Sequence, residues 1–314
     1  MSYVRSALTP LTLIAAGAAV VGLYAVVLSG LGSPLKGVVG QTAAVSMPVI
    51  ADEDAASAQR LDAAFTRMGY RLDDVAGGAA EVPPVFLAEV PDDLGDLPDP
   101  QTRKTVFLRV MLPLVLVVNE EIAADRRRLL AIVARKSRGE TMSADDTTFL
   151  AALAERYETE PGNLGTLLRR VDVVPPSLAL AQAAAESGWG TSRLVRRENN
   201  LFGHIAATDD EAAPRMRAFA TLHEAVRAYV LNLNTHRAYD QLRRARAQAR
   251  ARGTLADGHT LASTLTSYSE RGRAYVAQIR SLIRANALLR YDHARLASGR
   301  GWRTARLVVI ERAG

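Results

Sequence analysis

The stretch from Pro175 to Gly203, PPSLALAQAAAESGWGTSRLVRRENNLFG, constrains the fold more than any other part of the chain. Pro175 and Pro176 favour a helix start, because proline lacks a backbone N–H and the first helical turn needs none. The following residues are mostly alanine and leucine, and Gly188 is suited to end the helix. The sequence therefore predicts a slim apolar helix that lies deep inside a core.

Glu186 is the carboxylate near the end of this predicted helix. A carboxylate at the end of an almost uncharged helix is expected to be partly removed from water, which raises its pKa and suits it to act as a general acid. The alternative interpretation is an exposed polar residue on an amphipathic helix. Trp189, between two glycines, suggests an aromatic wall, and Gly190-Thr191-Ser192 predicts a turn into another helix that extends to Arg197.

The string LAQAAAESGWGTSRLVRRENNLFG resembles the signature of the glucosaminidase domain of glycoside hydrolase family 73, and in particular its Bax-type members from Gram-negative bacteria. The segments NLNTHRAY (232–239) and YSERGRAYV (268–276) extend the resemblance, which runs from about residue 84 to 289. It implies a mainly α fold, a lysozyme-like helical domain with a small loop or β lobe. It also implies cleavage of the β-1,4 bond after N-acetylglucosamine in peptidoglycan.

Within this resemblance, Glu186 matches the catalytic glutamate of the family and takes the role of general acid. A second group must stabilise or attack the oxocarbenium-like centre. One candidate is Glu211, in the segment that corresponds to the lobe of the family, where a second carboxylate would hold the attacking water. The other route uses the acetamido oxygen of the substrate, oriented by a hydroxyl; Tyr268 stands where related enzymes carry an important tyrosine. The sequence leaves both routes open.

Several further residues are predicted to bind the substrate: Trp189, Asn199, Asn200, Phe202, Glu270 and Tyr275. Some of them also have a structural interpretation. Phe202 suits a core anchor, the asparagine pair suits a tight turn, and Glu270 suits an ion pair with a neighbouring arginine. His204 replaces the glutamine expected in this family, and it has no second His or Cys at ligand spacing. We therefore expect no metal site and no cofactor.

The N-terminal segment predicts a membrane span. No charged residue occurs from Ser6 to Leu35, and the apolar part from Leu11 to Leu31 meets the ~20 residues that a transmembrane helix needs. Arg5 precedes it, which orients this end toward the cytoplasm. We expect an inner-membrane anchor with the catalytic domain in the periplasm, and a cleaved signal peptide is the alternative.

The chain has a formal net charge of +6 and no cysteine. A basic surface suits an anionic polymer such as the bacterial wall, an anionic lipid or a nucleic acid. No nucleic-acid-binding motif is present, so we expect peptidoglycan strands and the inner membrane as partners and no nucleic acid. The absence of cysteine excludes disulfides and a lipid-modified cysteine.

The predicted domain organisation has four parts: residues 1–36 form the membrane or signal segment, 37–100 a spacer and loop-rich connection, 101–295 the glucosaminidase domain, and 296–314 a tail, in which Leu307 to Ile310 suggest a strand. Within the domain, we expect a helix from Thr102 to about Arg135 that is interrupted at Pro113, with an apolar core run from Val106 to Val118.

Other helices are expected from their periodicity and their capping residues. Residues 144–157 follow a capping-box start at Ser143, and residues 163–170, 222–233, 261–268 and 275–289 are also expected to be helical. The arginine-rich run from Arg243 to Arg252 predicts a solvated helix face. Residues 204–219 predict a small loop or hairpin lobe.

Two other function classes fit the same pattern. A lytic transglycosylase shares a lysozyme-like architecture and a single glutamate but forms an anhydro-sugar product; the continuation SGWGTS argues against it. A membrane-tethered, non-catalytic wall-binding or scaffold protein would keep the fold without turnover. The retention of Glu186 argues against that class.

Overall fold

The computed structural model describes residues 52–206 and 215–297. The predicted membrane segment from Leu11 to Leu31, Glu211 and the strand suggested for 307–310 lie outside these ranges. Within them, no helix combines the length and the apolar character that crossing a bilayer requires.

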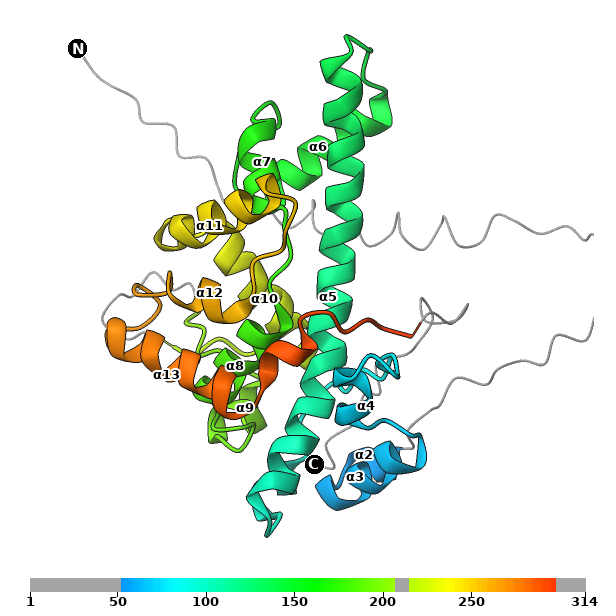
Figure 1. Cartoon of the computed structure of the whole chain (residues 1–314), viewed down its shortest axis with the longest axis vertical. Helices are drawn as coiled ribbons and strands as arrows, with labels where there is room; N and C mark the ends of the chain where they lie inside the picture. Colours follow the sequence, from blue (N-terminus) through cyan, green and yellow to red (C-terminus); the bar gives the residue numbers. More distant parts are fainter. Residues whose placement is uncertain (1–51, 207–214, 298–314) are drawn as a thin grey trace, which may run out of the picture. The chain divides into compact units, whose positions relative to one another are not determined.

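The predicted mainly α architecture is confirmed (Figure 1). The α-helices are α2 (Asp52–Ala55), α3 (Ala58–Arg67), α4 (Leu72–Ala76), α5 (Pro100–Ser137), α6 (Ala144–Arg156), α7 (Leu164–Arg170), α8 (Pro176–Ser187), α9 (Arg193–Glu198), α10 (Leu222–Thr235), α11 (Asp240–Ala251), α12 (Gly258–Ala262) and α13 (Arg273–Ala285). Short 3-10 helices are η1 (Asp92–Asp96), η2 (Arg237–Tyr239) and η3 (Leu288–Tyr291). In the described residues, β structure is limited to two isolated bridges, Val82 with Leu296 and Ile205 with Met216.

The helix α5 spans 38 residues and is the longest element (Figure 1). Asp99 caps its start by accepting from the N–H groups of Gln101 and Thr102. The run from Val106 to Val118 is buried throughout, as predicted. The interruption at Pro113 was expected as a kink or a restart of the helix. The restart is wrong, because α5 continues through this residue, and the kink stays a prediction. Pro113 lies inside the core, where packing on all sides outweighs the one hydrogen bond that proline removes.

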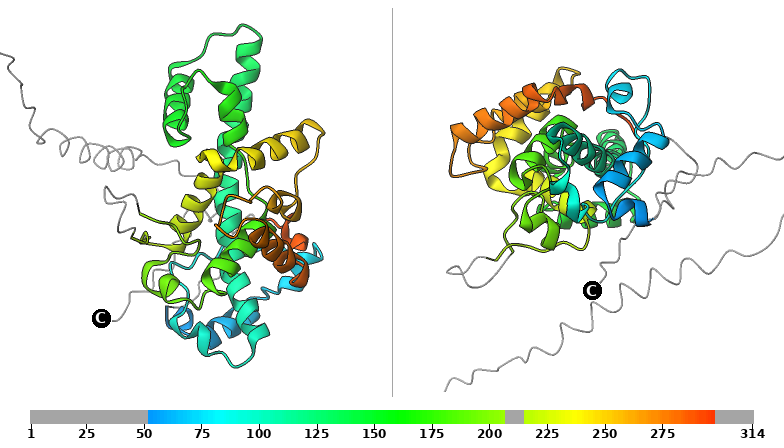
Figure 2. Two further views of the ribbon diagram at one scale, coloured as in Figure 1. Left: turned by 90° about the vertical axis from the view of Figure 1, so that its left-hand side faces the viewer. Right: turned by 90° about the horizontal axis from the view of Figure 1, so that it is seen from below.

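The segment before α5 belongs to the same core. Figure 2 (right) shows α2 to α4 on the opposite side of α5 from α13. Leu61 and Phe65 of α3 are buried, and Asp62 accepts a hydrogen bond from the nearly buried Arg109 of α5 at 2.9 Å. Residues 82–90, which the sequence assigned to a connection, are also mostly buried. This part of the chain therefore helps to build the core that surrounds α8.

The helix α8 confirms the predicted element and lies among α5, α12, α13 and η3. Pro176 is its first residue, and Gly188 closes it in the left-handed conformation (φ +58°). Asp292, far along the chain, caps its start by accepting from the Ser177 N–H at 2.7 Å and the Ser177 hydroxyl at 2.8 Å. Its residues are buried from Pro176 to Ala184. The helix is thus enclosed along most of its length.

The contact between α8 and α12 requires a glycine. A Cβ atom at Gly258 would lie 2.1 Å from Ser177 Oγ and 2.6 Å from the backbone nitrogen of Leu178. The backbone of α8 cannot move aside for such an atom without shifting the helix, and the Ser177 hydroxyl is buried and bonded to Asp292. Gly258 also donates its N–H to Asp292 Oδ2 at 3.2 Å, so one carboxylate joins both helix starts.

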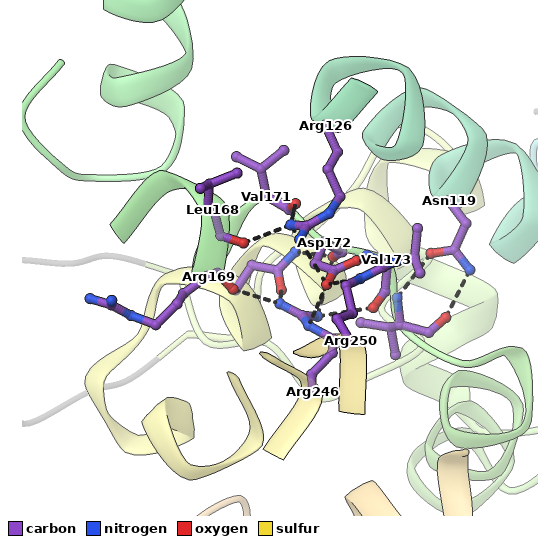
Figure 3. A network of polar contacts seen from close by, with 11 residues as sticks. Asn119, Arg126, Leu168, Arg169, Val171, Asp172, Val173, Arg246 and Arg250 are labelled. Carbon is purple, nitrogen blue, oxygen red and sulfur yellow. Dashed lines mark hydrogen bonds and ion pairs between the residues drawn. The ribbon is translucent and has the colours of Figure 1, made fainter. Parts of the chain in front are cut away.

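A buried cluster of charged residues fixes the connection that leads into α8 (Figure 3). Asp172 is 2 % exposed, and Arg250 donates to both of its carboxylate oxygens. Arg246 Nε and Arg126 Nη1 lie 3.6 Å and 3.7 Å from Asp172 Oδ2. The three guanidinium groups carry more positive charge than one carboxylate balances. Backbone carbonyl groups therefore also accept hydrogen bonds: the Val171 carbonyl accepts from Arg126, and the Val173 carbonyl accepts from Arg246.

This cluster corrects the interpretation of the arginine-rich run as a solvated face. Arg243 and Arg246 are each 4 % exposed. Arg243 donates to the carbonyl groups of Leu233 and His236, which end α10. Burial of an arginine is costly unless its charge and donors find partners. Here carbonyl groups accept from the Nη atoms of both arginines, and Asp172 Oδ2 lies 3.6 Å from Arg246 Nε.

Two other helices differ in extent from the prediction. The helix expected from Leu261 to Tyr268 ends at Ala262, and turns lead from there to Gly272. Gly272 has φ +51°, a conformation that ends the turn and starts α13. The helix expected to reach Leu289 stops at Ala285, where η3 follows. The early end of the first of these helices places Tyr268 on a turn instead of a helix.

The hairpin predicted after Gly203 is present at its two described ends. Ala206 N–H donates to Arg215 O at 2.8 Å, and Arg217 N–H donates to His204 O at 2.9 Å. The Asn200 side chain joins the strands by donating to both the His204 and the Arg217 carbonyl groups. Residues 207–214 lie outside the described ranges.

We predict that Gly258→Ala destabilises the protein by about 3 kcal/mol, because the new methyl group pushes α12 away from the backbone of α8. Urea denaturation at fixed pH measures this change. Gly165→Ala on α7 is the matched control, since its Cβ would meet only Arg169 Nη1 at 3.9 Å. We expect the control to be unchanged or stabilised by at most about 1 kcal/mol. Equal stabilities of the two variants would contradict the close approach of α12.

We also predict that stability falls on acidification because of His204. Its ring meets Phe202 and Phe219 edge-on, and Nε2 is buried with no hydrogen-bond partner in the described part of the chain. Burial, with the charge of Arg217, lowers the pKa of His204 from 6.5 to about 4. The unfolded chain therefore binds a proton between these values while the folded protein does not, which favours unfolding.

Denaturation at pH 7 and pH 5 tests this prediction. His204→Gln is expected to remove about 1 kcal/mol of the pH-dependent loss, a value reduced for the partial exposure of the ring. Other titrating groups remain in both proteins, so the difference between the two isolates His204. The same loss in the variant would show that the His204 ring is not held neutral.

Candidate active site

Glu186 lies in the last turn of α8, where the enclosed helix reaches the surface. Its side chain is half-buried. Gly188, Trp189 and Gly190 follow with positive φ values and turn the chain sharply away. Gly203 (φ +70°) passes beside the carboxylate, and a Cβ there would lie 3.9 Å from Glu186 Oε2. The position of the carboxylate is thus determined by the core helix on one side and by a glycine turn on the other.

The electrostatic environment of Glu186 favours its protonated form. Burial raises the pKa of this carboxyl group, whereas a hydrogen bond from Tyr275 and the charge of Arg271 lower it; burial is the larger effect. This direction agrees with the expectation from the uncharged helix sequence. A carboxyl group with a raised pKa is suited to donate a proton near neutral pH.

A group of tyrosines lies beside this carboxylate. The rings of Tyr268 and Tyr275 are stacked, with centroids 5.2 Å apart and 7° between their planes. The ring centroids of Tyr239 and Tyr268 are 5.8 Å apart, and Tyr229 is a buried residue of α10. Burial raises the pKa of all four hydroxyl groups. They therefore stay neutral and remain available as hydrogen-bond donors and acceptors.

Tyr268 and Tyr275 are the predicted residues that the structure brings to Glu186. Tyr275 is 2 % exposed and forms a hydrogen bond with the Glu186 carboxylate. Tyr268 is half-buried, and its hydroxyl donates to the Phe202 carbonyl group at 3.4 Å. This long bond connects the tyrosine cluster to the turn that contains Gly203. Glu270 is exposed two residues after Tyr268.

Asn199, Asn200 and Phe202 are buried instead of facing solvent. Asn199 adopts the left-handed conformation (φ +51°) and donates to the Phe219 carbonyl group at 3.2 Å. Asn200 links the two strands of the hairpin, and Phe202 stacks on Tyr229 with ring centroids 3.9 Å apart. The structure places these three residues where the turn and core interpretations put them. Their role in substrate binding stays a prediction.

Trp189 is directed away from the tyrosine cluster. Its ring meets Phe107 of α5 edge-on at 5.8 Å, and the Lys104 ammonium group lies 5.1 Å from the ring centroid. The half-buried indole therefore forms a surface between α5 and the turn after α8. The structure does not bring it into contact with Tyr268 or Tyr275, and sugar stacking on Trp189 also stays a prediction.

Two residues that the sequence did not indicate lie in this site. Gln182 and Tyr229 are both 0 % exposed, and Tyr229 donates to Gln182 Oε1 at 2.7 Å. Gln182 precedes Glu186 by four residues, which places both side chains on one face of α8. That spacing is the sequence signal that identifies Gln182, since it is the one amide in an otherwise apolar helix.

The arrangement is equipped for proton transfer. It contains one carboxyl group with a raised pKa and several neutral hydroxyl groups. In the described ranges, no group of three or more His, Cys, Asp or Glu side chains is placed to hold a metal ion. The chemistry that these residues support is general acid catalysis by Glu186.

Comparison with known proteins places these residues inside a known family of domains. Residues 165–288, which include Glu186 and the tyrosine cluster, match the Glucosaminidase family, described as mannosyl-glycoprotein endo-beta-N-acetylglucosaminidase. A curated relative, Protein bax of Escherichia coli (strain K12), is 37% identical over 194 residues, which cover 58% of this chain and 69% of the relative. No solved structure gives a significant match. The chain is therefore a member of the Bax-type glucosaminidase-domain family, with a domain of glycosidase type.

Proposed function

We propose that this protein is an endo-β-N-acetylglucosaminidase that hydrolyses β-1,4 bonds of peptidoglycan glycan strands, with Glu186 as the general acid. The observation that carries the proposal is the half-buried Glu186 carboxyl group with a raised pKa at the end of an enclosed helix. It lies inside the segment that matches the glucosaminidase family. Protonation of the leaving oxygen is the step that such a group performs in a glycosidase.

Peptidoglycan is the proposed substrate for two reasons. The Bax-type resemblance implies this polymer, and the net charge of +6 suits binding to an anionic wall. Arg271 and Arg273 are both exposed, and the positive charge of Arg271 acts on Glu186. These features support a substrate that is long, anionic and rich in N-acetylglucosamine.

The second catalytic role has two proposed solutions. Glu211 holds a water molecule in the first, as the base of an inverting enzyme with its carboxylate ~6.5–9.5 Å from the acid. In the second, the acetamido oxygen of the substrate attacks, and Tyr268 orients it. The Tyr268 hydroxyl supports the second solution, because its hydrogen bond to Phe202 is 3.4 Å long and is readily exchanged for a bond to a ligand.

We predict that Glu186→Gln lowers the rate of glycan cleavage by roughly 10²–10⁴-fold. Glutamine keeps the shape of the side chain but has no acidic proton to transfer. The fold is expected to stay intact. Glu155→Gln is the matched control, because Glu155 is an exposed glutamate near the end of α6. Full activity of Glu186→Gln would exclude the proposed role.

Mass spectrometry of purified glycan strands after digestion separates the function classes. The proposed hydrolase yields products with a reducing N-acetylglucosamine end. An anhydro-muramic end would indicate a lytic transglycosylase, and unchanged strands would indicate a wall-binding or scaffold protein.

The two routes for the second catalytic role predict opposite effects of two substitutions on the rate of glycan cleavage. Under the two-carboxylate route, Glu211→Gln is expected to cause a severe loss and Tyr268→Phe a mild one. Under substrate assistance, the order is reversed.

We further propose that residues 1–36 anchor the protein in the inner membrane and that the domain lies in the periplasm. The charge-free apolar span and Arg5 before it support this topology. A reporter enzyme that functions only outside the cytoplasm, fused after Gly314, is expected to be active. Activity of a cytoplasm-specific reporter at the same position would contradict the topology. Retention of the intact N-terminus in the mature protein would distinguish an anchor from a cleaved signal peptide.

A further inference from the structure

Gln182 lies in the core at the centre of a chain of hydrogen bonds that ends at Glu186. Its side chain is 0 % exposed. The Tyr229 hydroxyl donates to Gln182 Oε1 at 2.7 Å, and Gln182 Nε2 donates to the Tyr275 hydroxyl at 2.9 Å. Tyr275 in turn shares a hydrogen bond with the Glu186 carboxylate. Three helices, α8, α10 and α13, contribute to this chain.

The orientation of the Gln182 amide sets the direction of the chain. A phenol hydroxyl has one proton, and the nitrogen of a neutral amide can only donate. In the structure, Gln182 Oε1 accepts from the Tyr229 hydroxyl, and Gln182 Nε2 faces the Tyr275 hydroxyl. The Tyr275 oxygen therefore accepts from Gln182, which leaves its own proton for the Glu186 carboxylate.

The neighbouring rings hold both tyrosines in place. Phe202 stacks on the Tyr229 ring and Tyr268 on the Tyr275 ring, each with an interplanar angle of 7°. These stacks limit rotation of the two phenol groups, so their hydroxyl groups stay aligned with the Gln182 amide. The chain is rigid because aromatic packing, and not solvent, surrounds it.

The placement of a polar residue here is costly without such a role. The neighbours of Gln182 on α8, including Leu178, Ala179 and Ala183, are fully buried apolar residues. An amide in this environment is tolerated only when both its oxygen and its nitrogen are hydrogen-bonded. A methionine fills nearly the same volume without that requirement, so packing alone does not call for glutamine.

We propose that Gln182 is a positioning residue that acts through Tyr275: its amide, oriented by Tyr229, makes the Tyr275 hydroxyl donate its proton to the Glu186 carboxylate. This inference rests on the proposed function, because it concerns the strength of the proposed acid. A donor to the carboxylate favours the ionised form. Gln182 thus limits how far burial raises the pKa of Glu186 and keeps the acid able to transfer its proton.

Within residues 52–206 and 215–297, four charged or titratable groups act on Glu186. Tyr275 comes from α13, Arg271 from the turn before it, Tyr229 from α10, and Tyr268 from the turn after α12. Only Arg271 among them carries a charge near neutral pH, and it is exposed. A change of the Gln182 amide therefore alters the environment of Glu186 chiefly through the Tyr275 proton.

Carboxyl ¹³C NMR titration of the full protein tests this proposal without using activity. The Glu186 resonance is assigned from its loss in Glu186→Gln. Gln182→Met and Tyr275→Phe are each expected to raise the pKa of Glu186 by about one unit. Gln248→Met, an exposed glutamine on α11, is the matched control and is expected to leave the pKa unchanged.

The double variant Gln182→Met/Tyr275→Phe distinguishes positioning from a merely structural role. If Gln182 acts through Tyr275, the double variant shows no higher pKa than Tyr275→Phe alone. Additive shifts, or an unchanged pKa in Gln182→Met, would overturn the proposal. Tyr229→Phe keeps the stacked ring but removes the bond that orients the Gln182 amide, so it is a second test with little risk to the fold. It is expected to raise the pKa of Glu186 by a smaller amount. No rise would also overturn the proposal.

The pH profile of kcat/KM adds a functional readout. A general acid must be protonated, so a higher pKa of Glu186 moves the alkaline limb of the profile to higher pH in Gln182→Met. The two proposals fail in different ways. Loss of the proposed function shows as activity in Glu186→Gln, whereas loss of the positioning role shows as an unshifted Glu186 resonance in an otherwise active enzyme.

Discussion

The enclosure of α8 is the constraint on which the rest of the structure depends. A helix with neighbours on every side needs small residues, and its alanines let α5, α12 and α13 approach closely. Gly258 is the extreme case, since α12 touches the backbone of α8 there. The helix then brings one carboxylate from a closed core to the surface, so core packing determines the position of Glu186.

Local signals predicted several of the helix ends correctly. Ser143 caps α6, Ser192 caps α9, and Gly188 ends α8 in the left-handed conformation. Such signals involve residues within one turn of each other, and sequence order alone reveals them. The restart expected at Pro113 and the solvated face expected at Arg246 were wrong for the opposite reason. Their environments depend on distant segments, which bury the proline in α5 and surround the arginine with carbonyl groups and Asp172.

In the candidate active site, too, local sequence signals identify some residues, whereas contacts between distant segments decide the role of others. Glu186 was identifiable because a charged residue interrupts an apolar pattern, and Tyr268 and Tyr275 because a family resemblance included them. Asn199 and Asn200 had two interpretations, and only their contacts with the hairpin show how the fold uses them. The bond between Tyr229 and Gln182 joins residues that are 47 positions apart in the sequence, so periodicity does not reveal it.

Two buried polar networks, one at Ser177 and one at Gln182, fix the position of α8 along and about its axis, which alanine packing leaves undefined. A smooth helix face does not by itself specify how far the helix is translated or rotated, and a slip by one residue would move Glu186 by about 1.5 Å and turn it by about 100°. Asp292 fixes the start of α8 through Ser177, and the two tyrosines fix its middle through Gln182. A one-residue slip would leave these buried groups without partners, each costing about 1–3 kcal/mol. Polar contacts in the core therefore set the register in which the carboxylate meets the tyrosines.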